Sequence, residues 1–212
     1  MSVISIIGLG NMARALATRA LAGGNAVEVI GRDAAKAAAL ASELGGGTTT
    51  GTIGSAPTGD IVILAVPYAS AAPILAQYGQ ALAGKVIIDI SNPVDPTLTG
   101  LVTPDDSSAA QEIAKLAPAD AHVVKAFNTL FGHVLAATHA DNPPLDVFIA
   151  GDDTSAKARV ASFVESLALR PLDAGDLKMA RSLEAAALLM IALVIGKAVS
   201  DNNFSLAINS RG

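Results

Sequence analysis

Short apolar runs alternate along the chain with longer segments that have a helical pattern. The runs are apolar at nearly every position, which is typical of strands that a parallel sheet buries on both faces. This alternation predicts an α/β fold with a doubly wound, mostly parallel sheet. The predicted strands are Val3–Ile7, Val27–Ile30, Ile61–Val66, Val86–Ile90, His122–Ala126, Val147–Ala150 and a shorter one at Leu169–Leu172.

Several segments between these strands carry signals for helix starts. Ser108, followed three residues later by Gln111, predicts a capping box for a helix that ends near Leu116. The pair at 152–153 predicts the start of a helix that reaches Leu167, and residues 12–22 are free of helix breakers. Three glycines at 45–47 and the threonines after them predict a loop with a possible edge strand, and residues 93–106 predict a long loop.

The C-terminal part predicts one long helix, from Leu177 to Asn202, whose stretch at 185–195 has no polar side chain. A helix that is hydrophobic all round is buried, and this run falls short of the ~20 apolar residues that a membrane span needs. Burial within one copy of the chain is one interpretation. We expect that part of the helix is buried in a homodimer interface.

A glycine-rich turn, Gly8-Leu9-Gly10-Asn11-Met12-Ala13, stands between the first predicted strand and a predicted helix. In this context the glycines allow a tight turn and a close approach to a pyrophosphate, and the helix N-terminus directs its N–H groups at the phosphates. The turn therefore predicts a Rossmann-type dinucleotide-binding domain. We place this domain at residues 1–175 and a C-terminal helical segment, which contributes to the dimer and the active site, at residues 176–212.

The end of the second strand indicates which dinucleotide is bound. Gly31 leaves space there, and Arg32 and Lys36 can converge on one anion because they lie one helical turn apart. This pattern favours the 2′-phosphate of NADP(H). Asp33 has two interpretations, as the acid that binds the adenosine ribose of NAD or as a helix N-cap.

Further cofactor contacts are expected after later strands, because doubly wound sheets bind ligands at the carboxyl ends of their strands. Asn92 is interpreted either as a ligand of the ribose or carboxamide or as a turn cap. No Lys–Asp or His–Asp pair stands out in the sequence as a proton-transfer pair, so no catalytic residue is assigned, and hydride transfer needs only two juxtaposed rings. The residues predicted to bind cofactor from these strand ends are Ala65, Val66, Pro67, Tyr68, Asn92, Pro93, Ala126 and Asn128.

Composition excludes several other classes of protein. The net charge of −5 argues against nucleic acid and anionic membranes as partners. The chain has no cysteine, and its three histidines lack metal-ligand spacing, so we expect no metal site. The N-terminus begins directly with a strand and has no signal-peptide pattern, which predicts a cytoplasmic protein.

The motifs together resemble the family of NADPH-dependent reductases of the deazaflavin coenzyme F420. The resemblance implies hydride exchange between NADP(H) and a small-molecule acceptor with a deazaflavin or flavin-like ring. It also implies a dimer, and it assigns the nucleotide phosphates to residues 9–12, Arg32 and Lys36. The motifs are those at 7–13, 65–68, 91–93, 125–129, 150–153 and 170–175, followed by a helix with Arg181 and Glu184.

The acceptor stays open at this stage, because better-known deazaflavin-using members of this family carry a histidine where Asn128 stands. Two alternatives also remain. Pyrroline-5-carboxylate reductases, which reduce a small imine, begin with a very similar turn. A non-catalytic NADP(H) sensor would explain why no acid–base residues are evident.

Overall fold

The computed structural model, which describes residues 2–137, 143–199 and 202–209, has a single eight-stranded sheet of order β3-β2-β1-β4-β5-β6-β7-β8. All neighbouring strands are parallel except β6 and β7. This arrangement confirms the predicted Rossmann-type α/β fold. The strands are β1 Val3–Ile7, β2 Ala26–Gly31, β3 Thr49–Thr52, β4 Ile61–Leu64, β5 Val86–Asp89, β6 His122–Lys125, β7 Asp146–Gly151 and β8 Arg170–Gly175.

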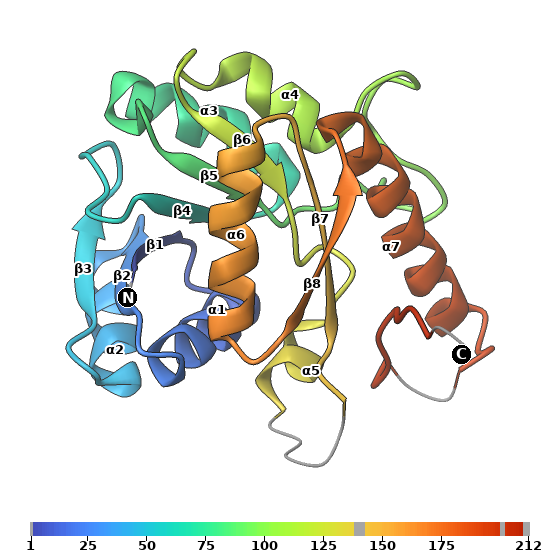
Figure 1. Cartoon of the computed structure of the whole chain (residues 1–212), viewed down its shortest axis with the longest axis horizontal. Helices are drawn as coiled ribbons and strands as arrows, with labels where there is room; N and C mark the ends of the chain where they lie inside the picture. Colours follow the sequence, from blue (N-terminus) through green and yellow to red (C-terminus); the bar gives the residue numbers. More distant parts are fainter. Residues whose placement is uncertain (1, 138–142, 200–201, 210–212) are drawn as a thin grey trace.

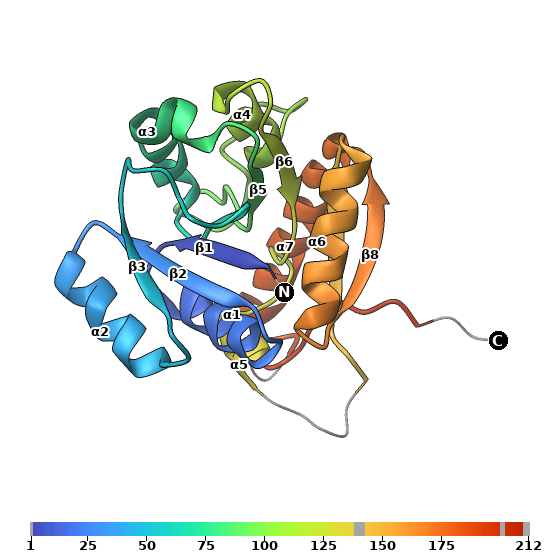
Figure 2. The ribbon, with the colours of Figure 1, turned by 60° about the vertical axis from the view of Figure 1, so that its left-hand side comes forward.

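Helices cover both faces of the sheet. Figure 2 shows α3 and α4 on one side of β1 and β2, and α1 and α2 on the other. In Figure 1, α6 crosses the front of the sheet and α7 lies beside β7 and β8. The helices are α1 Asn11–Ala22, α2 Ala34–Leu44, α3 Tyr68–Tyr78, α4 Ala109–Leu116, α5 Gly132–Ala136, α6 Thr154–Ser166 and α7 Ala180–Ile195, with 3-10 turns η1 Gly79–Leu82 and η2 Leu177–Met179.

The two helical layers create two hydrophobic cores. Neighbouring strand residues alternate between them: Ile63 packs into the core under α1 and α6, and Val62 and Leu64 pack into the core under α3 and α4. A strand that is buried on both faces needs an apolar residue at every position, which explains the continuous apolar runs in the sequence.

The predicted local signals agree with the structure in three places. The Ser108 hydroxyl accepts a hydrogen bond from the Gln111 N–H at 3.1 Å and caps α4. Asp153 caps α6 by accepting from the N–H of Ala156. The threonines after the glycine-rich loop form the edge strand β3.

Some predicted strand ends were too late. β4 ends at Leu64 and not at Val66, because the chain leaves the sheet toward Pro67, the N-cap of α3. β5 and β6 also end one residue before the predicted positions, at Asp89 and Lys125. The shift in β5 and β6 matters, because it makes a charged residue the last member of each of these two strands.

The predicted long C-terminal helix is present, but its bounds differ from the predicted range of Leu177 to Asn202. The 3-10 turn η2 precedes α7, and α7 ends at Ile195, where Gly196 and a left-handed Lys197 (φ 56°) follow. Only one face of α7 is buried; Leu189 on the outer face is 61% exposed. Residues 200–201 of the predicted helix lie outside the described residues. In the described ranges, no helix has the length and apolar character to cross a membrane.

Candidate functional site

The glycine turn after β1 is held by backbone contacts that only glycine allows. Gly8 has a φ of +132°, and its N–H donates to the Ile30 carbonyl at 2.8 Å. A Cβ added to Gly8 would lie 2.1 Å from the carbonyl oxygen of Ala65. A side chain at this position would therefore push β1 and β4 apart.

The N-terminus of α1 is free to receive an anion. Gly10 is its N-cap, no side chain caps it, and its first turn holds no acidic residue. The first N–H groups of a helix have no intrahelical acceptor, and the first backbone bond here runs from Arg14 N to Gly10 O. A Cβ on Gly10 would meet no protein atom within 4 Å. The turn thus offers free N–H groups and open space, the two features that a pyrophosphate needs.

A cavity of about 710 Å³ opens beside this turn, between the ends of β1, β2 and β4 and the start of α3. It brings together nine of the predicted cofactor-binding residues: Gly8, Leu9, Gly10, Gly31, Arg32, Lys36, Ala65, Val66 and Pro67. Its other lining residues include Ile53, Pro73 and Gln77. Its size suits a nucleotide moiety.

The cations at the cavity are accessible. Arg32 is exposed and has no hydrogen-bond or ion-pair partner within the part of the chain that the structure describes. Lys36 lies 3.8 Å from the Asp33 carboxylate, and its side chain is 78% exposed. The other Asp33 oxygen accepts the N–H of Lys36 and caps α2. The structure therefore supports the N-cap interpretation of Asp33.

The space expected beside Gly31 is partly filled by the chain itself. A Cβ on Gly31 would lie 2.4 Å from Cδ1 of Leu9. The glycine therefore makes room for the Leu9 side chain, which packs across the end of β2. This contact ties the conformation of the glycine turn to the strand that carries Arg32.

The remaining predicted residues do not line this cavity. Asn11 and Met12 form the first turn of α1, and Tyr68 begins α3. The others follow β5 and β6, at a second part of the carboxyl edge: Asn92, Pro93, Ala126 and Asn128.

Asn92 and Asn128 form a mutual pair. The Asn128 Nδ2 donates to Asn92 Oδ1 at 2.9 Å and to the carbonyl of Leu183 in α7 at 2.9 Å. In return, the Asn92 Nδ2 donates to the backbone carbonyl of Asn128 at 2.8 Å. Asn128 is buried and Asn92 is half-buried. Only Asn92 therefore presents part of its side chain to a ligand.

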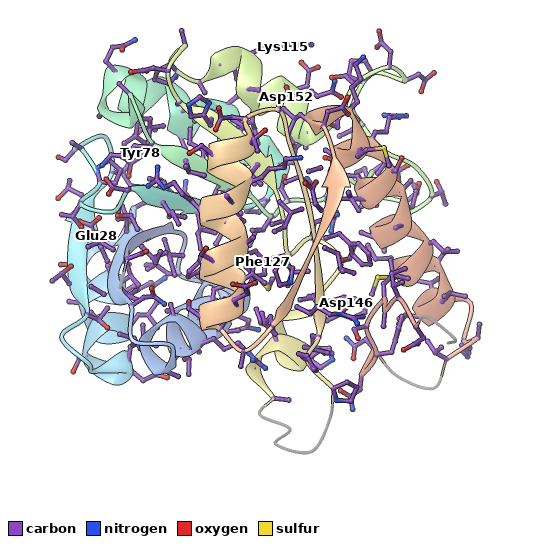
Figure 3. The ribbon with its side chains drawn as sticks, in the orientation of Figure 1. Glu28, Tyr78, Lys115, Phe127, Asp146 and Asp152 are labelled. Atoms are coloured by element: carbon purple, nitrogen blue, oxygen red, sulfur yellow. The ribbon has the colours of Figure 1, made fainter. Side chains whose placement is uncertain are left out.

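Phe127, the residue before Asn128, has an unusual backbone conformation. Its φ of 61° is left-handed, which is rare for a bulky residue. The ring is 1% exposed and packs edge-on against Phe163 of α6, and Figure 3 shows it in the middle of the molecule. Packing thus holds a strained backbone, and strain of this kind clusters at functional sites.

A buried charge cluster lies next to the asparagine pair, and it contains a Lys–Asp pair at two strand ends that was not identified from the sequence. Asp89 and Lys125 are register partners at the ends of β5 and β6. The Lys125 Nζ donates to Asp89 Oδ2 at 2.7 Å and to the Ser91 carbonyl at 2.6 Å, and it lies 2.8 Å from Oε1 of Glu184 in α7. All three charged side chains have an exposed fraction of 0%.

Sequence reasoning missed this cluster because the pairing depends on strand register and on Glu184, which lies 59 residues farther along the chain than Lys125. One signal was present: both strands are apolar runs that end in a charged residue, and buried charges need partners. Burial raises the pKa of the Glu184 carboxyl, and Lys125 opposes that rise. Burial and nearby carboxylates, including Glu184, also raise the pKa of Tyr68.

Comparison with known proteins gives a family match. Residues 3–93, from β1 to the loop after β5, match the family described as NADP oxidoreductase coenzyme F420-dependent. A crystal structure from Arthrobacter sp. FB24, provisionally assigned as an F420-dependent NADP reductase, is 26% identical with a TM-score of 0.81. That comparison covers 97% of this chain and 99% of the other.

Two curated relatives are more similar in sequence. Metalloreductase STEAP3 of Rattus norvegicus is 34% identical over 185 residues, which are 86% of this chain and 36% of that protein. The F420-dependent NADP reductase of Methanocaldococcus jannaschii is 31% identical over 147 residues, which are 66% of this chain and 65% of that protein. The chain thus spans about a third of the first relative and just under two thirds of the second.

Proposed function

We propose that the chain is an NADP(H)-dependent oxidoreductase of the family described as NADP oxidoreductase coenzyme F420-dependent, which residues 3–93 match. Its likeness to the relatives and the solved structure described above supports this proposal. The proposed reaction transfers a hydride between NADPH and a small-molecule acceptor with a deazaflavin or flavin-like ring. The observation that carries the proposal is the joining of the open glycine turn and two accessible cations in one cavity.

The cavity accounts for the adenosine and phosphate half of NADP(H). The N–H groups at the start of α1 receive the pyrophosphate, and Arg32 and Lys36 bind the 2′-phosphate as a guanidinium and an ammonium. No acidic side chain of the described residues lies at the first turn of α1 to repel the phosphates. NADPH, when bound, would supply the hydride, and NADP⁺ would accept it in the reverse direction.

The asparagine pair accounts for the nicotinamide half. The parallel arrangement puts the ends of β5 and β6 at the same edge of the sheet as the glycine turn. Asn92 keeps one N–H of its amide uncommitted, since its described bonds use only the other. We assign this N–H to the ribose or carboxamide of the nicotinamide. The protein then acts chiefly by holding two rings together.

A spectrophotometric assay with NADPH and oxidised coenzyme F420, and with FMN as a second acceptor, tests the proposal. Catalytic bleaching of either acceptor supports it and identifies the ring. If NADPH binds and neither acceptor is reduced, the oxidoreductase proposal in this form is wrong and a non-catalytic NADP(H) sensor takes its place.

The proposed enzyme is a homodimer that uses the outer face of α7. Leu189 on this face is 61% exposed, and Ile195 at the end of α7 is 55% exposed. Burial of these apolar side chains against a second copy would stabilise the dimer. Light scattering at micromolar concentration should give twice the chain mass of 21.2 kDa. A mass of one chain would refute the dimer.

A further inference from the structure

Lys125 contacts the residues that flank the asparagine pair, Ser91 on one side and Glu184 on the other. Its ammonium donates to the carbonyl of Ser91, the residue before Asn92. It also pairs with Glu184, the residue after Leu183, whose carbonyl accepts from Asn128. One buried cation thus fixes the backbone next to each end of the pair.

Each carboxylate of the cluster also accepts a hydrogen bond from a backbone N–H group nearby. Asp89 pairs with Lys125 through Oδ2, and its Oδ1 accepts the N–H of Ser91 at 2.9 Å. Glu184 pairs with Lys125 through Oε1, and its Oε2 accepts the N–H of Ala109 at 3.1 Å, at the start of α4. The loop after β5, the loop after β6 and α7 are therefore joined at one point.

This junction sets which way the two amides face. The Leu183 carbonyl can only accept a hydrogen bond, so Asn128 must turn its Nδ2 toward α7 and toward Asn92 Oδ1. With its oxygen engaged, Asn92 must keep its N–H groups on the other side, one on the Asn128 carbonyl and one uncommitted. If α7 moved, Asn128 would lose the hydrogen bond to Leu183, and only the bonds within the asparagine pair would still hold the two amides.

We propose that Lys125, Asp89 and Glu184 are positioning residues that orient the Asn92 amide toward the nicotinamide half of NADP(H). The inference rests on the proposed function, since it assumes that NADP(H) is the ligand. The cluster touches neither ligand nor reacting atoms; it acts through Ser91, Leu183 and Asn128.

The variant Glu184→Gln tests the proposal without leaving a buried lysine unpaired. It keeps the volume and one amide oxygen, and Lys125 still has Asp89 as a counter-ion, so we expect the fold to persist. The matched control is Glu28→Gln. Glu28 is 4% exposed and is bonded to the Ser5 hydroxyl and the Thr58 N–H. Figure 3 shows it beside β3, across the molecule from α7.

Calorimetric titration of the full chain with two ligands, NADP⁺ and adenosine 2′,5′-bisphosphate, separates the two halves of the cofactor. Only NADP⁺ carries the nicotinamide. For Glu184→Gln we expect the affinity for NADP⁺ to fall roughly threefold to tenfold, as for one weakened hydrogen bond, with the affinity for the bisphosphate unchanged. Glu28→Gln should change neither affinity.

An equal loss for both ligands, or no loss for either, would overturn the positioning role. If Glu184→Gln does not fold, Asn128→Leu removes the middle link and should give the same split between the ligands; a bisphosphate loss there would again overturn it. Failure of the wild-type chain to bind either ligand would refute the proposed function itself, an outcome distinct from the others.

Discussion

Arg32→Ala should weaken NADPH binding while leaving NADH binding nearly unchanged, because only NADPH carries the 2′-phosphate that this side chain is proposed to bind. Arg32 lines the cavity beside the glycine turn and has no partner among the described residues. No internal ion pair therefore has to break before it binds a phosphate, and its removal leaves no other charge uncompensated.

The magnitude follows from its position at the cavity rim. A hydrogen bond to a charged group contributes about 1.5–3 kcal/mol, and solvent screening at an exposed site lowers that figure. We therefore expect a loss of about 1–2 kcal/mol, or roughly 5- to 30-fold in the Kd for NADPH. Lys36→Ala should lose less, because Lys36 is 78% exposed and already lies 3.8 Å from the Asp33 carboxylate.

Fluorescence titration with NADPH and with NADH measures both constants on the same samples. Arg159→Ala is the matched control, since Arg159 is an exposed arginine of α6 that does not line the cavity. Equal losses for NADPH and NADH in Arg32→Ala would refute the 2′-phosphate assignment. A loss in Arg159→Ala as large as that in Arg32→Ala would show that general charge, and not a specific contact, governs affinity.

Three other variants test the fold and its charges. Gly8→Ala should cost more than about 2 kcal/mol of stability, because the added Cβ clashes with Ala65 and the φ of Gly8 is positive. Gly10 has open space around it, so Gly10→Ala should keep the wild-type Tm and weaken NADPH binding roughly tenfold. Similar Tm values for the two variants would contradict this. Asp146→Asn should lower Tm by roughly 2–8 °C at neutral pH. The Arg170 hydrogen bond lowers the pKa of Asp146, so the stabilisation disappears as pH falls through the lowered value, and the Tm difference should shrink below about pH 3.9. A pH-independent Tm difference in thermal scans would argue against the ion pair. Burial raises the pKa of Glu184, so the stability that this group contributes is lost as pH rises from about 4.3 through the raised pKa. Across this pH window, the Tm of Glu184→Gln should rise relative to the Tm of the wild type. A Tm difference that does not grow with pH would count against a buried carboxylate.

That nine of the predicted cofactor-binding residues line one cavity was predictable, because the determinants of their position are local. A glycine turn between a strand and a helix requires contacts within a few residues, and Arg32 follows β2 directly. Parallel pairing then brings the ends of β1, β2 and β4 together whatever the rest of the chain does. Sequence spacing was therefore enough to name nine residues that line one cavity.

The charge cluster was not predictable in the same way, because it depends on two separate features of the tertiary structure. β5 and β6 must end in register at Asp89 and Lys125, and α7 must dock so that Glu184 reaches the ammonium. The sequence contains no spacing that encodes either event. The end of α7 was missed for a related reason, since an apolar run does not show where a left-handed residue such as Lys197 will stop a helix.

The single face by which α7 meets the site separates the effects of substitutions in this helix. Two groups of α7 make the contacts described above. They are the Leu183 carbonyl, which any residue type supplies, and the Glu184 carboxylate. Exposed neighbours such as Ser182, Ala185 and Leu189 lie on the other side of the helix. Substitutions there would change the proposed contact between two copies, whereas a substitution of Glu184 would change the surroundings of the asparagine pair.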